Sequence, residues 1–447
     1  MIMKNRFLLY SVILYSIILY LFVNIKNINE GSSGLVLLGM TLLLGILLIL
    51  YEAYSVKKLY CQKSFFLFIL FISYFIYRIV CDMENMYFLK AFTVSTTSGI
   101  VLFYFLGIIV SFVLSLIKGH VLKKKESLKI FNIFFFAFSL VILIVFIMTY
   151  SFLSSFMSEK LFLITILNGN YQRPGTFLSI AFLIYSVFYM LFIVLNNKFK
   201  NEYKLLVLFL SIAYIGAILG AILLSQMIAS NNALVTLVGM LFLTLVFLIN
   251  IYYFKIEYLM ENKRIILKNI LFNKTTLFLL ISIVIVFVTI IIIFVGMVLI
   301  FDIDLSRFRI FGFGAEQINS ITARIELWKN FTTHFKYSPF FGNMAVDRLT
   351  TGDGTYVHSF LGSLLTHLGV VGFVLFFSYL YFAFKELLNI EEDFIENKLI
   401  TLYLSLLYLG IFAIAIFGVH VSWIPLWFLL GMIFPVFKFK NRKEDIV

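Results

Sequence analysis

Apolar stretches of about 20 residues alternate with short polar segments along most of this chain of 447 residues. An α-helix rises about 1.5 Å per residue, so a stretch of that length spans the roughly 30 Å hydrocarbon core of a bilayer. The pattern predicts an all-α polytopic membrane protein with a single membrane domain, residues 1–447. We expect 12 transmembrane helices, the last of them short, at residues 6–24, 35–54, 64–81, 97–117, 130–150, 177–196, 205–225, 236–254, 275–301, 359–383, 399–418 and 422–437.

One long polar interruption separates the ninth predicted span from the tenth. It covers residues 302–358 and is predicted to be a large loop outside the bilayer. Within it, apolar residues recur at helical spacing, which indicates a short amphipathic helix with one side on apolar material. These residues are Ile318, Ile321, Ile325, Trp328 and Phe335. Pro339 and Gly342 end the helix, and His358 stands where the chain becomes apolar again.

Two sets of residues at this interruption share the spacing of known motifs. In the first set an Arg-x-x-x-Trp pair precedes a Pro-x-x-Gly pair, at Arg324, Trp328, Pro339 and Gly342. In the second set His358-Ser359 is followed, after nine residues, by Gly369-Val370-Val371-Gly372. Together they resemble the O-antigen polymerase and O-antigen ligase family of membrane glycosyltransferases. The resemblance is sharp over residues 319–372. Elsewhere it consists of a similar number of helices and one further arginine loop, and it implies a GT-C-like fold.

The composition excludes a soluble protein, because 62% of the residues are hydrophobic and only 13% are charged. The net charge of +13 does not indicate a nucleic-acid partner, since the basic residues stand in short clusters between the spans. Of the 35 Lys and Arg residues, 24 fall on one predicted side. The positive-inside rule therefore predicts both termini in the cytoplasm and residues 302–358 outside. The resemblance implies the bacterial cytoplasmic (inner) membrane.

His358 is the first candidate for chemistry. A histidine at the edge of a span is costly unless it is used, and a neutral imidazole can take a proton from a sugar hydroxyl. The resemblance implies that His358 activates the acceptor hydroxyl in this way. The alternative is an interfacial histidine whose ring reaches the lipid headgroups. His367 is expected about 13 Å deeper along a helix, as a packing or hydrogen-bonding residue.

Four arginines form the second group of candidates. The family transfers glycans from a lipid diphosphate, and guanidinium groups bind diphosphate through paired hydrogen bonds without a metal. The resemblance implies that Arg324 is catalytic and stabilises the leaving group, and that Arg173 and Arg348 hold the diphosphate. Arg78, inside the third predicted span, is a further candidate for the diphosphate. The alternative for Arg173 is a positive charge at the headgroup surface.

A metal and an energy-carrying cofactor are not expected. Asp302 and Asp304 have the spacing of an Asp-x-Asp metal motif, but two carboxylates at the end of a span more often mark the start of a solvated loop. The chain contains no Walker, Rossmann or zinc-ligand pattern. We therefore predict no cofactor, and a donor that arrives already activated on a lipid.

The resemblance implies a polysaccharide polymerase at the outer face of the membrane. It would transfer glycan from a polyprenyl-diphosphate-linked donor to the hydroxyl of a lipid-linked repeat unit, during growth of capsule or O-antigen chains. The expected partners are this donor and acceptor, the lipid bilayer, and a chain-length regulator and a flippase of the same pathway, but no nucleic acid. The abundance of Ile, Lys, Asn and Phe favours an AT-rich bacterium, many of which lack the lipid A core that a ligase needs.

Three alternatives remain open at the level of sequence. The first is an O-antigen ligase of the same family. The second is a lipid-linked oligosaccharide flippase or transporter, against which the absence of proline from all predicted spans but the last and the scarcity of charge at mid-membrane both count. The third is an oligosaccharyltransferase-like enzyme that uses a metal at Asp302 and Asp304.

Overall fold

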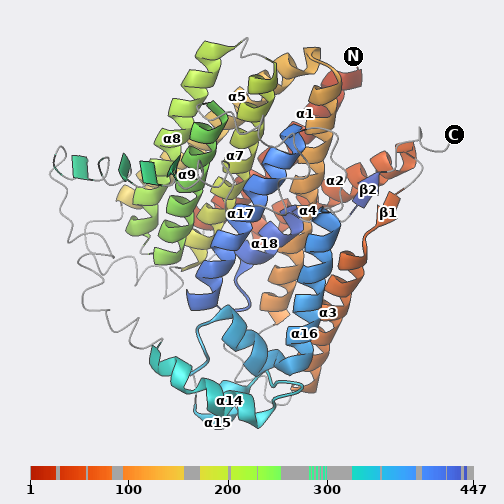
Figure 1. Ribbon diagram of the computed structural model, residues 1–447, viewed down its shortest axis with the longest axis vertical. Helices are drawn as coiled ribbons and strands as arrows, with labels where there is room; N and C mark the ends of the chain where they lie inside the picture. The colour runs from red at the N-terminus through yellow and green to blue at the C-terminus, as the bar shows by residue number, and fades with distance from the viewer. Residues whose placement is uncertain are drawn as a thin grey trace. The chain divides into compact units, whose positions relative to one another are not determined.

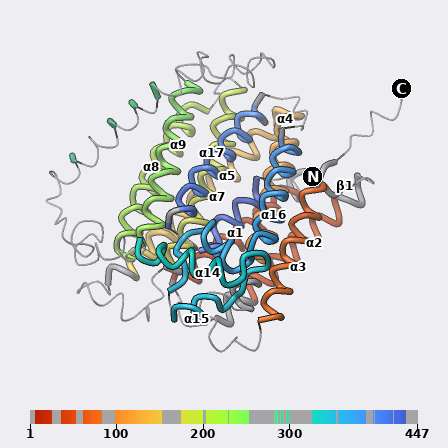
Figure 2. The backbone as a smooth tube through the Cα atoms, turned by 60° about the horizontal axis from the view of Figure 1, so that its bottom comes forward, coloured from red at the N-terminus to blue at the C-terminus, as the bar shows by residue number. Residues whose placement is uncertain are grey.

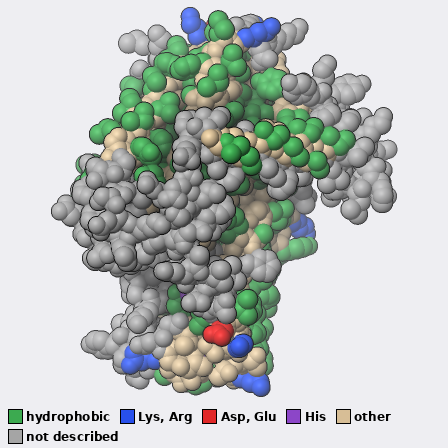
Figure 3. Space-filling view, turned by 90° about the vertical axis from the view of Figure 1, so that its left-hand side faces the viewer, with side chains coloured by type: hydrophobic (Ala, Val, Ile, Leu, Met, Phe, Trp, Pro, Cys, Tyr) green, Lys and Arg blue, Asp and Glu red, His purple; other side chains and the backbone are tan. Residues whose placement is uncertain are grey.

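A computed structural model shows a helical protein with one short β-ladder (Figure 1). The structure describes residues 2–26, 31–56, 59–82, 94–155, 172–199, 203–228, 230–252, scattered positions of 281–299, 325–352, 355–388, 395–418, 420–433 and 437–439. Among these residues the exposed side chains of the helices are mostly apolar (Figure 3). Such a surface is expected where lipid, not water, surrounds the protein.

Nine helices in the described part of the chain are long and apolar enough to cross a membrane. They confirm that the chain has the architecture of a polytopic membrane protein, and each coincides with a predicted span. These helices are α1 (Ile2–Lys26), α3 (Lys63–Cys81), α4 (Val94–Lys123), α5 (Glu126–Ser155), α7 (Gln172–Lys198), α8 (Lys204–Met227), α9 (Asn231–Tyr252), α16 (Phe360–Leu388) and α17 (Ile395–Gly418).

The three other predicted spans differ from these nine. In α2 (Gly31–Val56) the apolar stretch of Val36–Glu52 is shorter, and in the range 275–301 only scattered helical positions are described. The twelfth prediction, 422–437, corresponds to α18 (Ile424–Ile433), whose 10 residues extend about 15 Å and cover only half of a bilayer core. The total of 12 crossings therefore stays a prediction, as does the GT-C-like fold.

The described chain divides into two compact units, and the prediction of one membrane domain stays a prediction. Unit 1 consists of Met1–Leu38, Leu114–Glu316 and Glu392–Gly410. Its central helix is α7, which packs against α1, α5, α8 and α9 and is buried at every residue from Phe177 to Asn196. Asn196 exchanges two side-chain hydrogen bonds with Asn132 of α5, at 3.0 and 3.1 Å. These bonds satisfy the two amides in an otherwise apolar interior.

Unit 2 is organised around the antiparallel helices α3 and α16, which lie side by side in Figures 1 and 2. It consists of Gly39–Val113, Gln317–Glu391 and Ile411–Val447. At the amino end of α3 the Glu386 carboxylate accepts hydrogen bonds from the main-chain N–H and the hydroxyl of Ser64. A carboxylate is favourable there because the helix start carries partial positive charge. Beside this end, β1 (Leu59–Cys61) pairs antiparallel with β2 (Phe437–Phe439).

Close backbone contact fixes the short helix α18 within unit 2. A Cβ atom added to Gly107 of α4 would overlap the main chain of α18, and one added to Gly431 would overlap the main chain of α4. The Trp427 ring of α18 is fully buried against Phe71 of α3 and Phe376 of α16. The polar ring nitrogen of Trp427 donates to the Val421 carbonyl at 2.7 Å, so this indole is both buried and hydrogen-bonded.

Helix α16 is broken at Gly369, which has φ 64° and ψ −170°. The pattern of apolar residues predicts one continuous helix over 359–383, and this prediction is wrong at Gly369. A glycine interrupts the helix where no proline marks an interruption. The absence of proline from all predicted spans but the last therefore no longer counts against a protein with broken helices.

The segment 339–343, here called the insertion loop, fills the break. The Val370 and Val371 amides donate to the carbonyls of Pro339 at 2.9 Å and Phe340 at 3.0 Å. In the opposite direction, the Asn343 amide donates to the Thr366 carbonyl at 3.3 Å. The loop thereby supplies the hydrogen bonds that the break removes from the helix.

Two glycines allow the insertion loop and the broken helix to touch. Gly342 has φ 69°, a backbone conformation that favours glycine. A Cβ atom on Gly342 would overlap the main chain of His367 and Gly369, and one on Gly369 would overlap the main chain of Phe340 and Gly342. The Pro-x-x-Gly pair of the first motif and Gly369 of the second are therefore two halves of one contact.

The rest of the polar interruption is folded next to this contact. Residues 325–329 are helical, a turn follows at Asn330, and α14 (Phe331–Tyr337) and α15 (Val346–Thr350) complete the segment. The amphipathic helix predicted over 318–335 is thus present from residue 325, and residues 318–324 lie outside the described part. Its apolar side chains Ile325 and Trp328 are 59% and 39% exposed, as expected for a helix that rests on apolar surroundings.

The substitution Gly342→Ala should destabilise the protein. The left-handed backbone alone costs an alanine roughly 1–2 kcal/mol, and the overlap with Gly369 adds to that cost. Thermal unfolding of protein purified in lipid nanodiscs measures the effect. Gly39→Ala in α2 is the matched control, because no atom other than the adjacent backbone of its own helix lies within 4 Å of the added Cβ. Equal melting temperatures for the two variants would show that the contact does not support the fold.

Candidate functional site

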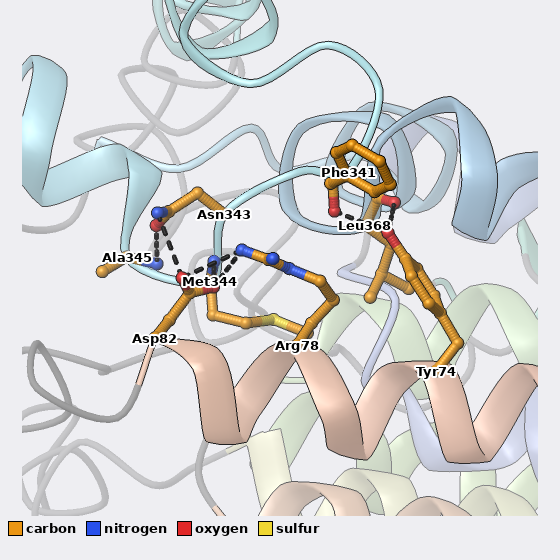
Figure 4. Close-up of polar contacts among 8 residues, drawn as sticks. All are labelled: Tyr74, Arg78, Asp82, Phe341, Asn343, Met344, Ala345 and Leu368. Carbon is orange, nitrogen blue, oxygen red and sulfur yellow. Dashed lines mark hydrogen bonds and ion pairs between the residues drawn. The ribbon is translucent and has the colours of Figure 1, made fainter.

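The second half of α3 is hydrogen-bonded both to the insertion loop and to α16 at its break (Figure 4). The Tyr74 hydroxyl donates to the main-chain oxygens of Phe341 at 2.7 Å and Leu368 at 3.1 Å. Phe341 belongs to the insertion loop, and Leu368 is the last residue before the break in α16. One side chain therefore contacts the loop and the helix where they meet.

One turn further along α3, Arg78 and Asp82 form a largely buried ion pair. The Arg78 Nη2 atom lies 2.9 Å from both carboxylate oxygens of Asp82, and the two side chains are 12% and 7% exposed. The same carboxylate accepts hydrogen bonds from the Met344 amide at 2.9 Å and the Asn343 side-chain amide at 3.3 Å. Figure 4 shows this arrangement directly. Arg78, a predicted ligand of diphosphate, is thus engaged in holding the insertion loop to α3.

His358 lies just outside the amino end of α16. Ser359, the second residue of the motif, accepts a hydrogen bond from the Gly362 amide through its hydroxyl at 3.2 Å. A serine at this position is a common helix cap, because it satisfies an amide that has no partner within the helix. The cap places His358 in non-helical backbone, where its side chain is half-buried.

Three histidines and one tyrosine of unit 2 form a continuous group of rings, here called the histidine cluster. The Tyr356 ring centroid lies 4.4 Å from that of His358 and 5.3 Å from that of His420. The His420 centroid in turn lies 5.4 Å from that of His367. His358 precedes α16 and His367 lies within it, and the expected separation of about 13 Å between them stays a prediction.

Hydrogen bonds define the protonation of two members of the cluster. The His367 Nδ1 atom lies 3.0 Å from the Ser363 carbonyl, and since a carbonyl can only accept, Nδ1 carries the proton. The His420 Nδ1 atom accepts from the Ser422 amide at 3.4 Å. Burial, followed by the neighbouring rings of His367 and His358, holds the pKa of His420 well below its ordinary value. The His420 ring is therefore neutral at neutral pH.

A fourth histidine supports the turn that leads into the cluster. His334 of α14 is fully buried, and its Nε2 atom lies 2.8 Å from the Thr351 hydroxyl. The Thr351 hydroxyl also hydrogen-bonds that of Thr355, the residue before Tyr356. Burial lowers the pKa of His334, so the neutral ring is the form that fits this position.

The predicted arginines occupy different parts of the chain. Arg348 is half-buried in α15 of unit 2. Arg173 is the second residue of α7 in unit 1, and its side chain is outside the described part of the structure. Arg324, Asp302 and Asp304 also lie outside the described residues. Their roles stay predictions.

Sequence reasoning missed His420 and Tyr356. A signal for His420 was present, because residues 419–421 form a short predicted loop on the same predicted outer side as His358. A histidine at the boundary of a span is unusual enough to be compared with others on that side. Tyr356 carried no such signal, since tyrosine is common at membrane boundaries.

Within the described ranges, no three His, Cys, Asp or Glu side chains are grouped so that they could hold a metal ion. This statement includes the histidine cluster, whose members contact one another mainly through their rings. The Asp-x-Asp candidate falls outside those ranges and is not addressed by it.

No protein-family model, curated protein or solved structure matches this chain. The functional argument therefore depends on the residues, their geometry and the motif resemblance. The strongest geometric finding is that the two separately spaced motifs meet at the insertion loop, against the main chain of His367.

A stability measurement separates a structural role of Arg78 from diphosphate binding. We expect Arg78→Gln and Asp82→Ala each to lower the free energy of unfolding by about 3 kcal/mol, because each leaves a buried charge without its partner. The double variant Arg78→Met with Asp82→Leu should lose less free energy of unfolding than the two single variants lose together. Lys336→Gln, an exposed charge on α14, should have little effect. An Arg78→Gln protein with unchanged stability but weakened donor binding would restore Arg78 to the diphosphate site.

Proposed function

We propose that this protein is a membrane glycosyltransferase that transfers a glycan from a polyprenyl diphosphate to a sugar hydroxyl outside the cytoplasm. The observation that carries the proposal is the interlock of the two motifs. Gly342 of the first motif contacts Gly369 of the second through backbone atoms, and the Pro339 carbonyl accepts from the amide of the adjacent Val370. The half-buried His358 of the second motif lies at the opposite end of the same helical segment. The two motifs whose spacing resembles that of the family are thus also in contact in the structure. A chance match of spacing would not require such a contact.

In the proposed reaction His358 is the general base. Its neutral imidazole takes the proton of the acceptor hydroxyl while that oxygen forms a bond to the anomeric carbon of the donor. The bond from that carbon to the diphosphate oxygen breaks, and the electron pair leaves with the diphosphate. Attack from the opposite side inverts the configuration of the anomeric carbon.

Arginines stabilise the diphosphate in this proposal. Arg324, Arg173 and Arg348 retain the roles that the resemblance implies, since bidentate hydrogen bonds to the departing oxygens offset the developing charge. Arg78 is left out of the set, because the Asp82 carboxylate already pairs with its guanidinium. Its contribution is to hold the insertion loop.

The proposed class is a polymerase of capsule or O-antigen chains in the bacterial cytoplasmic membrane, with its site facing outward. The donor carries its own activation as a lipid diphosphate, which agrees with the lack of any nucleotide-binding motif in the sequence. A ligase of the same family would use the same residues, and the compositional argument for an AT-rich host is what favours the polymerase.

A transporter is the alternative from another class, and the broken helix α16 favours it. Transporters often bind substrate at unwound backbone near mid-membrane. In this protein, however, the break exposes the amides of Val370 and Val371, and carbonyls of the insertion loop accept hydrogen bonds from both. Because these groups are already satisfied, the break supports a structural role better than a substrate site.

The variant His358→Ala tests the proposed base. In purified protein supplied with lipid-linked donor and acceptor, we expect transfer to fall by about 10² to 10⁴, the usual cost of removing a general base. His120→Ala is the matched control, because His120 lies in the part of α4 that belongs to unit 1 and outside the histidine cluster. Wild-type transfer should persist in excess chelator. Full activity of the His358 variant, with the lipid-linked donor consumed, would refute the assignment.

A further inference from the structure

The inference concerns what holds the His358 ring, and it rests on the proposed function. We propose that His420 is a positioning residue for His358 and acts through the ring of Tyr356. His420 has no place in the motif resemblance, and it reaches the cluster from the segment between α17 and α18. The assignment follows from the order of ring contacts and from the anchoring of His420.

The Tyr356 ring lies between the proposed base, His358, and its proposed support, His420. Tyr356 contacts His358 at a centroid distance of 4.4 Å and an interplanar angle of 44°. Tyr356 also meets His420 at 5.3 Å and 81°, an edge-to-face arrangement that aromatic pairs prefer. The tyrosine ring is therefore the neighbour of both imidazoles and transmits the position of one to the other.

Three hydrogen bonds hold the backbone of the segment that carries His420. The Val421 amide donates to the Ser363 hydroxyl of α16 at 2.9 Å, which ties this segment to the helix that follows His358. The Trp427 ring donates to the Val421 carbonyl at 2.7 Å, and the Trp423 amide donates to the His420 carbonyl at 3.0 Å. His420 is thus fixed to the same helix whose first turn Ser359 caps.

His358 needs such support because of where it lies. It stands in non-helical backbone and is half-buried, so no helix fixes its side-chain direction. A general base must reach the hydroxyl within about 3 Å, and a displacement of 1 Å can cost about 100-fold in rate. Removing the His420 ring would leave space beside Tyr356, and both Tyr356 and His358 could then move.

The test compares variants that remove the ring with one that keeps it. We expect His420→Ala to lower kcat by about tenfold or more with KM nearly unchanged, because the base is misplaced while substrate binding is preserved. His420→Phe should restore most of kcat, since a flat ring can still meet Tyr356 edge-on. Tyr356→Ala is a second route to the same defect, and it leaves the hydrogen bonds of residues 420–423 untouched.

A second readout does not depend on glycan transfer. The intact protein in nanodiscs is treated with diethyl pyrocarbonate and then digested, and mass spectrometry measures the rate at which His358 is modified. This rate reports how tightly the His358 ring is packed. We expect this rate to rise severalfold in His420→Ala and Tyr356→Ala and to stay near the wild-type value in His420→Phe. His120→Ala serves as the control for both readouts.

Each outcome bears on one of the two proposals. Unchanged modification of His358 in His420→Ala would overturn the positioning role, whatever the activity. Equal loss of kcat in His420→Phe and His420→Ala, with His358 unchanged, would overturn it as well and assign chemistry to the His420 nitrogens. If wild-type protein transfers no glycan while the modification rates follow the ring, the positioning role stands and the proposed function fails.

Discussion

The structure of unit 2 depends on the need to satisfy backbone groups where a membrane helix is interrupted. An interrupted helix exposes amides and carbonyls, and each would be costly in an apolar environment. In α16 the break at Gly369 is closed by the insertion loop, whose carbonyls accept from Val370 and Val371. The polar segment 325–352 is thus connected to α16 by main-chain hydrogen bonds, and its contact with the helix does not rely on side-chain packing alone.

Other features of unit 2 stabilise this closure. Tyr74 hydrogen-bonds to main-chain oxygens on both sides of the contact, and Asp82 holds Asn343 and Met344 while it pairs with Arg78. All of these groups bind atoms close to the break. At the opposite end of the same helical segment, the Ser359 hydroxyl caps α16. The position of His358 then follows from the helix cap, the turn supported by His334, and the rings of Tyr356 and His420.

Much of the fold could be predicted from hydrophobicity, because the length of an apolar stretch is a local property with a direct physical meaning. Nine predicted spans correspond to helices that are long and apolar enough to cross a membrane among the described residues, whereas α18 is shorter than the apolar run that predicts it. The break at Gly369 was not predicted, since a glycine inside an apolar stretch is compatible with a continuous helix. Only contact with a loop 27 residues earlier in the chain, at Gly342, makes the break favourable.

The candidate site was predictable only in part for the same reason. His358 stands out locally as a histidine at the edge of a span, but the partners of Arg78 and His358 are determined by tertiary contacts. Asp82 lies one helical turn from Arg78, and a pairing with a distant phosphate was equally compatible with the sequence. His420 is separated from His358 by two apolar segments, so no spacing rule connects them.

The most direct test of the central claim is the lipid-linked glycan pool of a host that lacks the gene. A polymerase acts after its substrate has crossed the membrane, so single repeat units should accumulate on lipid diphosphate at the outer face, where an added glycosidase can degrade them. The surface should carry at most single units. Long polymer still attached to lipid diphosphate, or single units trapped on the cytoplasmic side, would contradict the assignment as a polymerase.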